Sequence, residues 1–180
     1  MSQINYNIIR NLMNKPNHIR GLAKDLKTNQ TTIARKMREL SEANTVDFKI
    51  DGKNKTYFLK KTIETKEHLI IAEHYELLKT IKKYPILRNI IEQIKKEKSI
   101  NMAILFGSYT KGLANKNSDI DLYLDTKDKK IKEKIENINS KLNIKTGKYN
   151  KNSILIKEIQ KNHVIIKGAE IYYEKNGFFE

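Results

Sequence analysis

The sequence predicts an α+β protein made of two small domains that are joined by a helical connector. Three observations support this fold class. Several segments carry apolar residues at helical spacing, shorter runs alternate or are continuously apolar as strands are, and Gly, Asn and Pro separate them. A chain of 180 residues has room for one domain or two small ones. We place the N-terminal domain at residues 1–61, the connector at 62–98 and the C-terminal domain at 99–180.

The composition excludes several classes of protein. Because the sequence has no cysteine, a disulfide scaffold, a zinc finger and a thiol nucleophile are ruled out. Apolar runs such as Met102–Phe106 are far shorter than the ~20 residues that span a bilayer. The N-terminal residues show no signal-peptide pattern. We therefore expect a soluble protein of the cytoplasm.

The excess of basic residues indicates a polyanionic partner. The chain has 36 Lys and Arg against 21 Asp and Glu, a net charge of +15, and nucleic acid is the default partner for such a charge. A Lys-rich solubilising surface, or a coding bias toward Lys, Asn and Ile, is the alternative. Residues 1–61 carry 13 basic and 5 acidic residues. Their net charge of +8 is more than half of the +15 of the whole chain. We therefore expect a nucleic-acid contact first in the N-terminal domain.

The N-terminal domain is expected to contain three helices followed by a β-hairpin. Apolar side chains on one face predict each helix. Two alternating runs around Asp51-Gly52, a strong hairpin turn signal, predict the strands. The expected bounds are 4–14, 18–26 and 30–40 for the helices and 45–50 and 55–60 for the strands.

This order of elements resembles a winged helix-turn-helix. The segment HIRGLAKDLKTNQTTIARKMREL is similar to the helix-turn-recognition-helix core of winged-helix regulators, and VDFKIDGKNKTYFL is similar to their wing. The resemblance implies DNA binding, with the third helix in a major groove and the wing against a neighbouring backbone. The residues that it implicates are Gln30, Thr31, Thr32, Arg35, Lys36, Arg38, Lys53 and Lys55. A three-helix domain that contacts protein is the alternative.

Residues 63–97 are predicted to be largely helical, with a break near Pro85. Tyr84 precedes that proline and is therefore biased away from helical geometry. This segment carries more apolar residues than one buried helix face requires, and a surplus apolar stripe on such a connector often packs against a second subunit. Since winged-helix proteins commonly dimerise to bind two half-sites, this favours a homodimer. Packing between the two domains is the alternative.

The segment NMAILFGSYTKGLANKNSDIDLYLD carries the predicted chemistry. A buried strand at Ala103–Phe106 ends at Gly107-Ser108, and a second strand starts with Asp119 and Asp121, whose side chains share one face. Two adjacent carboxylates repel each other unless a cation lies between them, and carboxylates together with substrate phosphates are typical Mg²⁺ ligands. A Gly-Ser turn can offer N–H groups and a hydroxyl to a phosphate. The pattern favours metal-assisted nucleotidyl transfer; two solvated aspartates beside a chance Gly-Ser are the alternative.

The pattern G-S-x10-D-x-D resembles the signature of the DNA polymerase β-like nucleotidyltransferase superfamily. FGSYTKGLANKNSDIDLYL is most similar to its minimal nucleotidyltransferase branch, over roughly residues 85–180. The resemblance implies an α/β domain with a small mixed sheet. It implicates Gly107, Ser108 and Lys111 in binding the nucleotide, and Asp119 and Asp121 in Mg²⁺ binding and catalysis. As a loop residue, Lys111 can instead be simply solvated.

One departure from this superfamily concerns a third carboxylate. Active members usually carry it on a later strand, often as the base that activates the attacking hydroxyl. That strand is expected near residues 142–149, which contain no acid. The residues expected at the place of the third acid are Lys145, Thr146 and Lys148. Asp125 is about 13 Å from Asp121 along a strand, and Glu158 is expected to be a surface charge on a helix at Asn152–Lys161.

The rest of the C-terminal domain is expected to contain a helix at Ile131–Leu142 and, after residue 152, a closing helix and a short strand. Minimal nucleotidyltransferases resemble antitoxins that transfer AMP from ATP to a Tyr of a HEPN toxin. The resemblance implies Mg²⁺-dependent AMP transfer to a hydroxyl of a partner protein, with the winged helix repressing its own operon. A regulator whose degenerate domain binds only nucleotide or a partner is the main alternative. A transferase that acts on RNA or a small molecule is a less favoured one.

Overall fold

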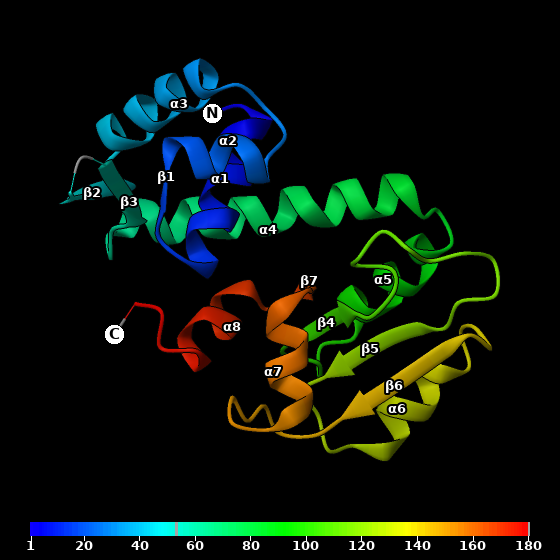
Figure 1. Cartoon of the computed structure of the whole chain (residues 1–180). Helices are drawn as coiled ribbons and strands as arrows, with labels where there is room; N and C mark the ends of the chain where they lie inside the picture. Colours follow the sequence, from blue (N-terminus) through cyan, green and yellow to red (C-terminus); the bar gives the residue numbers. More distant parts are fainter. Residues whose placement is uncertain (53, 180) are drawn as a thin grey trace. The chain divides into compact units, whose positions relative to one another are not determined.

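The computed structural model describes residues 1–52 and 54–179 (Figure 1). Its contacts divide the chain into two compact units. Unit 1 comprises Met1–Tyr75 with Phe179, and unit 2 comprises Glu76–Phe178 among the described residues. The division after Tyr75 falls inside the segment 62–98 that we expected to be a connector.

Unit 1 begins with three helices and a small antiparallel sheet, in the order that the sequence predicts, and ends in the first part of a fourth helix (Figure 1). Its elements are α1 (Gln3–Asn14), β1 (Asn17–His18), α2 (Ile19–Asp25), α3 (Gln30–Glu42), β2 (Val46–Asp51), β3 (Asn54–Leu59) and the first part of α4 (Ile63–Lys83). The strand order is β1-β3-β2. The two-residue strand β1 was not expected, because only its pairing with Tyr57 and Thr56 makes it a strand.

Side-chain caps explain where two of these helices begin. The Asn29 side chain accepts a hydrogen bond from the Thr32 N–H at 2.7 Å, so α3 starts directly after the turn. The Nδ1 atom of His18 accepts one from the Gly21 N–H at 2.7 Å and caps α2. The core of the unit is apolar, with Ile8, Ile9, Leu22, Ile33 and Leu40 fully buried.

Unit 2 is built on a four-stranded mixed sheet. Its elements are the end of α4, α5 (Leu87–Lys96), β4 (Ala103–Phe106), β5 (Ile120–Leu124), α6 (Lys129–Glu136), β6 (Leu142–Thr146), α7 (Ile154–Lys161), β7 (Val164–Lys167) and α8 (Ala169–Lys175). The strand order is β6-β5-β4-β7, with β4 antiparallel to both neighbours and β5 parallel to β6. The predicted small mixed sheet is therefore present.

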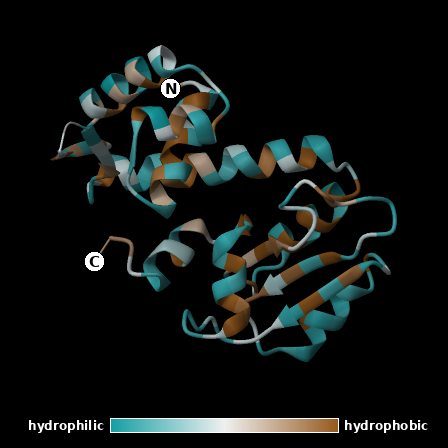
Figure 2. Cartoon of the chain, viewed as in Figure 1, coloured by the Kyte–Doolittle hydropathy of each residue, from teal (hydrophilic) through white to brown (hydrophobic). Residues whose placement is uncertain are grey.

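The two faces of β5 separate the core of unit 2 from its chemistry. Ile120, Leu122 and Leu124 are fully buried in one hydrophobic cluster with residues of α5 and α6. Figure 2 shows both hydrophobic and hydrophilic residues along β5 and β6, while α6 is largely hydrophilic. The alternate residues Asp121 and Tyr123 lie on the opposite face.

Two elements of unit 2 differ from the sequence prediction, and one predicted break is present. The helix expected over Ile131–Leu142 ends at Glu136, because a turn after Asn137 leads into β6. Helix α8 after the last strand was not predicted at all; its buried Tyr172 and Tyr173 complete the core. The break before Pro85 is where we expected it, since α4 ends at Lys83 and α5 begins at Leu87.

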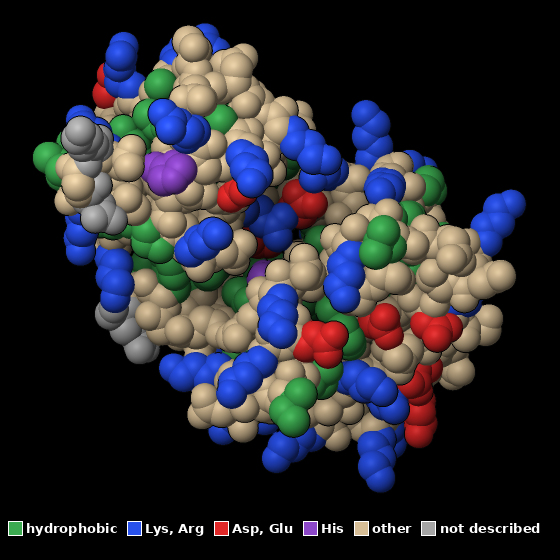
Figure 3. Space-filling model, in the orientation of Figure 1, with side chains coloured by type: hydrophobic (Ala, Val, Ile, Leu, Met, Phe, Trp, Pro, Cys, Tyr) green, Lys and Arg blue, Asp and Glu red, His purple; other side chains and the backbone are tan. Residues whose placement is uncertain are grey.

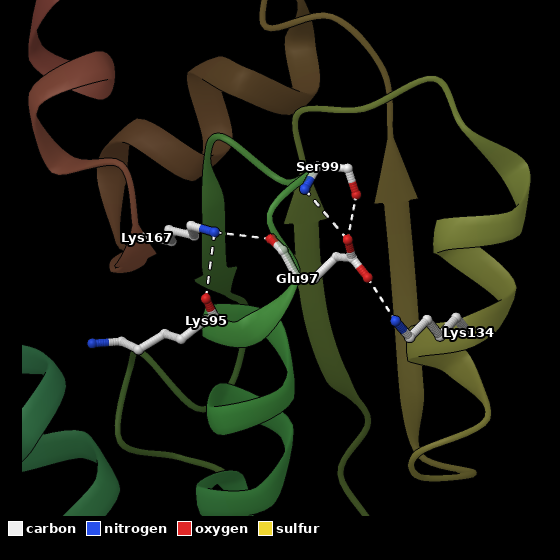
Figure 4. Close-up of polar contacts among 5 residues, drawn as sticks. All are labelled: Lys95, Glu97, Ser99, Lys134 and Lys167. Carbon is white, nitrogen blue, oxygen red and sulfur yellow. Dashed lines mark hydrogen bonds and ion pairs between the residues drawn. The ribbon is translucent and has the colours of Figure 1, made fainter.

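A polar network closes the C-terminal end of α5 (Figure 4). Lys167 Nζ donates to the backbone oxygen of Glu97 at 2.9 Å, where the helix dipole favours a cation. The Glu97 carboxylate accepts from Lys134 Nζ at 2.7 Å and from the hydroxyl and N–H of Ser99. These contacts, first of all that from Lys134, lower the pKa of Glu97 to about 2. The network joins α5 to α6 and to β7.

None of the helices within residues 1–52 and 54–179 has both the length and the apolar character needed to cross a membrane.

Candidate functional site

The Gly-Ser turn and the aspartate pair come together at one end of the sheet in unit 2. In the antiparallel register of β4 and β5, Phe106 lies opposite Asp121. The chain leaves β4 at Gly107 and Ser108, so this turn follows directly beside the carboxylate of Asp121. The structure thus brings together residues that are more than ten positions apart in the sequence.

Gly107 is required at this turn for two reasons. Its φ of +76° lies in the left-handed region, which residues with a Cβ avoid. A Cβ on Gly107 would also lie 2.2 Å from Oδ2 of Asp121, far inside van der Waals contact. The backbone of the turn and the carboxylate therefore pack directly against each other.

Hydrogen bonds hold the loop that follows this turn. The Thr110 hydroxyl donates to the Gly107 carbonyl at 2.9 Å, and the Leu113 N–H donates to the Ser108 carbonyl at 3.0 Å. The side chain of Ser108 is half-buried, whereas that of Lys111 is exposed. The structure thus places Lys111 on the same loop as the turn, with its ammonium group in solvent.

A second turn leads into Asp119. The Ser118 hydroxyl accepts from the Asn115 N–H at 2.9 Å, and the Ser118 N–H donates back to the Asn115 carbonyl at 3.2 Å. Asp119 itself is exposed, and Asp121 is half-buried. The two carboxylates thus differ in environment, and Asp119 is the more accessible to a ligand.

Lys83, in the last turn of α4, and Tyr84, which follows it, contact the loop after Ser108. Lys83 Nζ donates to the Gly112 carbonyl at 3.1 Å. The ring of Tyr84 meets that of buried Tyr109 edge-on, with centroids 4.8 Å apart. Burial raises the pKa of the Tyr109 hydroxyl. Tyr109 is therefore a neutral anchor for the loop and offers no ionised oxygen to the site.

On the strand where we expected the third carboxylate, the residue beside Asp121 is Asn143 and none of the three that we predicted. Parallel pairing of β5 and β6 sets Asn143 beside Asp121, and its amide donates to Asp121 Oδ1 at 2.8 Å. The three residues expected at this place, Lys145, Thr146 and Lys148, are exposed and lie farther along the chain, the last beyond the end of β6. The missed signal was the position of Asn143 between the apolar Leu142 and Ile144, which marks the face opposite the core.

Two other acids near the motif lie elsewhere, as we expected. Asp125 accepts from the Tyr149 N–H at 3.0 Å and pairs with Lys175 Nζ at 2.8 Å. Glu158 is exposed on α7. Neither joins the aspartate pair.

Residues 88–176 match the model of the family described as polymerase beta, nucleotidyltransferase. This part of the chain is a nucleotidyltransferase domain of the polymerase β-like superfamily. The match covers α5 to α8, including the turn, the aspartate pair and Asn143. No curated protein and no solved structure matched the chain.

The donor set of the nucleotidyltransferase domain fits a hard divalent cation such as Mg²⁺. Asp119 and Asp121 offer carboxylate oxygens, and Mg²⁺ commonly uses one or two carboxylates together with substrate phosphates. The missing Cβ of Gly107 lets the Asp121 carboxylate lie against the backbone of the turn, and Asn143 orients that carboxylate. Among the described residues, no group of three or more His, Cys, Asp or Glu is arranged to hold a metal ion. A cation here would therefore depend on two protein carboxylates and on the nucleotide.

The residues implicated in DNA binding lie mainly on the outer face of α3 in unit 1. Exposed and half-buried side chains there are those of Gln30, Thr31, Thr32, Arg35 and Arg38. Lys55 on β3 is exposed, with Nζ 4.0 Å from the centroid of the Phe48 ring. Lys53 lies outside the described residues. On the face drawn in Figure 3, Lys and Arg side chains are more numerous than Asp and Glu.

Lys36 does not lie where we predicted it. Its side chain is buried, and Nζ contacts the Glu39 carboxylate at 2.7 and 2.9 Å. Asn5 donates to the same carboxylate at 3.3 Å. These contacts, Lys36 first, lower the pKa of Glu39. At helical spacing Lys36 falls near the apolar face of α3, so its ammonium group pairs with Glu39 of the same helix, whose carboxylate in turn contacts Asn5 of α1.

Proposed function

We propose that the C-terminal domain binds ATP with Mg²⁺ and transfers AMP to a hydroxyl group of a partner protein. The observation that carries this proposal is the packing of the Gly107 backbone against the Asp121 carboxylate. That contact sets a candidate triphosphate cradle directly beside a candidate metal ligand. Asp119 and Asp121 would hold the cation, and Gly107 and Ser108 would hold the triphosphate.

In the proposed reaction the acceptor oxygen bonds to the α-phosphorus while the bond to the pyrophosphate oxygen breaks. When bound, Mg²⁺ would supply charge neutralisation on the phosphate oxygens. Asn143 would orient Asp121 through its amide N–H. A neutral amide cannot take the proton of the attacking hydroxyl, so that proton leaves to water or to a group of the acceptor.

For unit 1 we propose DNA binding as a winged helix-turn-helix. The support is the order of three helices and a hairpin, together with the exposed polar side chains of α3. This proposal includes a homodimer that binds two half-sites. It also includes autoregulation: the operon would encode a HEPN-type toxin as well, and that toxin would be the acceptor of AMP. Arg35→Ala should then weaken DNA binding at several salt concentrations, and an unchanged affinity would contradict α3 as the recognition helix.

A second candidate function follows from Asn143. Because a neutral amide stands where active relatives usually carry an acid, the domain would bind a nucleotide or a partner without transfer. The protein would then be a DNA-binding regulator that senses a nucleotide.

Calorimetric titration of ATP, with and without Mg²⁺, tests both candidates. We expect Mg²⁺-dependent binding by the wild type and its loss in Asp119→Asn/Asp121→Asn. The matched control is Glu133→Gln/Glu158→Gln, which removes two exposed charges of the same domain. If the wild type binds no ATP, the transferase and the ATP-sensing form of the second candidate both fail, and only the binding of a partner protein is left. If it binds ATP but labelled AMP never appears on a co-purified partner, the second candidate replaces the first.

A further inference from the structure

Unit 2 has an open pocket at the end of the sheet opposite the aspartate pair. It has a volume of about 590 Å³, and the residues that line it are Lys148, Tyr149, Asn150, Lys151, Asn152 and Lys175. All but Lys175 belong to the loop between β6 and α7 (Figure 1). Its charged lining residues are thus three lysines.

The pocket lies on the same face of the sheet as the aspartate pair, but at the other end of β5. Asp121, Tyr123 and Asp125 share that face by strand alternation. The loop between β6 and α7 contacts the part of this face that lies beyond Asp121. The Tyr123 hydroxyl donates to the Gly147 carbonyl at 2.7 Å, and the Tyr149 N–H donates to Asp125. Four residues along a strand correspond to about 13 Å. The pocket is therefore separate from the candidate nucleotide site.

The lysines differ in how far they are engaged. Lys175 pairs with Asp125 at 2.8 Å, and its side chain is 32% exposed. Lys148 and Lys151 are exposed, and the side chains of Asn150 and Asn152 beside them are exposed as well. Because the nearby carboxylate of Asp125 already has two partners, a positive charge is left at the rim.

The backbone of the loop argues against a cradle for one phosphate. Such a cradle needs several free N–H groups that converge on the ligand. Here the Asn152 N–H donates to the Asn150 side chain, and the Ser153 N–H donates to the Asn150 carbonyl. The Tyr149 N–H is bound to Asp125. What the pocket offers is exposed ammonium groups on long side chains, which suit a chain of phosphates.

We propose that this pocket, with Lys148 and Lys151 at its rim, binds the phosphodiester backbone of a nucleic-acid strand without reading its bases. Tyr149 lines the pocket but is only 7% exposed, so little of its ring is available for a base to stack on. Affinity would come from lysine–phosphate contacts and the release of counterions, and would fall with salt. The proposal does not depend on ATP or Mg²⁺.

Fluorescence anisotropy with a labelled single-stranded RNA tests this on the full chain. Lys148→Gln/Lys151→Gln is compared with Lys127→Gln/Lys129→Gln, which removes the same charge from exposed lysines around the start of α6. Each phosphate contact to a single strand contributes about 0.7 to the slope of log affinity against log salt. The pocket variant should therefore lose about 1.4 from this slope. Between 50 and 200 mM salt its affinity should fall about sevenfold less than that of the wild type.

Three results would overturn the proposal. The first is an unchanged slope in the pocket variant. The second is an equal loss in both double variants, which would show an effect of net charge alone. The third is that millimolar inorganic phosphate abolishes the difference between the variants at constant ionic strength, because the ligand would then be a single phosphate. Thermal unfolding of both double variants checks that they are folded. None of these three results bears on ATP binding, so this proposal can fail without the proposed function.

Discussion

Asp121 and Asp125 lie four residues apart on the same face of the sheet, but their surroundings differ. Asp125 has one oxygen on a backbone N–H and the other on the Lys175 ammonium group. Asp121 accepts one amide N–H from Asn143 and otherwise packs against a glycine. A carboxylate with a cationic partner is already neutralised, whereas one held by a neutral amide keeps its charge for a ligand. The comparison separates a structural acid from a candidate metal ligand.

The largest expected effect comes from adding a Cβ at Gly107, where the Asp121 carboxylate now lies. Gly107→Ala should weaken Mg²⁺-ATP binding at least about tenfold, since the new Cβ must displace the carboxylate, and the left-handed φ should cost about 1–2 kcal/mol of stability. Gly52→Ala is the matched control, because Gly52 has a φ of +57° with nothing within 4 Å of its Cβ position. Titration calorimetry and thermal unfolding measure the two effects. Equal ATP binding by both variants would show that Asp121 is not a ligand.

Removing the structural acid should have the opposite pattern. Asp125→Ala leaves the Tyr149 N–H and Lys175 without their acceptor, which should cost about 1–3 kcal/mol of unfolding free energy. Mg²⁺-dependent ATP binding should stay as in the wild type. Chemical denaturation and calorimetry report both quantities, and lost ATP binding in a folded variant would place Asp125 in the site.

A change at Asn143 would turn the neutral partner of Asp121 into a charged one. In Asn143→Asp, two carboxylates would lie side by side, so the unfolding free energy should fall by about 1 kcal/mol without Mg²⁺. Mg²⁺ should restore this loss, because a cation between the carboxylates removes the repulsion. Asn143→Ala, which adds no charge, should show no such rescue. Chemical denaturation with and without Mg²⁺ measures this rescue. Equal denaturation curves for Asn143→Asp under the two conditions would show that position 143 does not lie at the metal site.

The smallest expected effect concerns Glu97, a second structural acid (Figure 4). Its folded-state pKa of about 2 lies below its ordinary value of 4.5. It therefore stabilises the fold at pH values above 4.5, and this contribution is lost as the pH falls from 4.5 toward 2. Glu97→Gln should unfold at a lower temperature than the wild type at pH 7, and the two melting curves should converge in that acidic range. A difference that is independent of pH would show that the ionised carboxylate contributes nothing.

Local signals predicted most of the fold. The turn at Asp51-Gly52 and the pre-proline Tyr84 each act within a few residues, and the elements that they bound are present. The motif likewise placed Gly107 beside the aspartate pair. Asn143 was missed because its role depends on the register of two parallel strands that are far apart in the sequence. Lys36 was misplaced because its side chain pairs with Glu39, whose carboxylate is also bound by Asn5 of α1, and an argument from α3 alone does not include that helix.

The contacts of Lys83 and Tyr84 determine where the nucleotidyltransferase domain must begin. The family match starts at residue 88, yet Lys83 holds the Gly112 carbonyl and Tyr84 packs on Tyr109. A fragment cut at residue 88 would expose the Tyr109 ring and release the loop that follows Ser108. A fragment that begins at Glu76, where unit 2 begins, keeps both contacts. The shortest piece for expression is therefore longer than the family boundary, and the end of α4 belongs to the domain that it precedes.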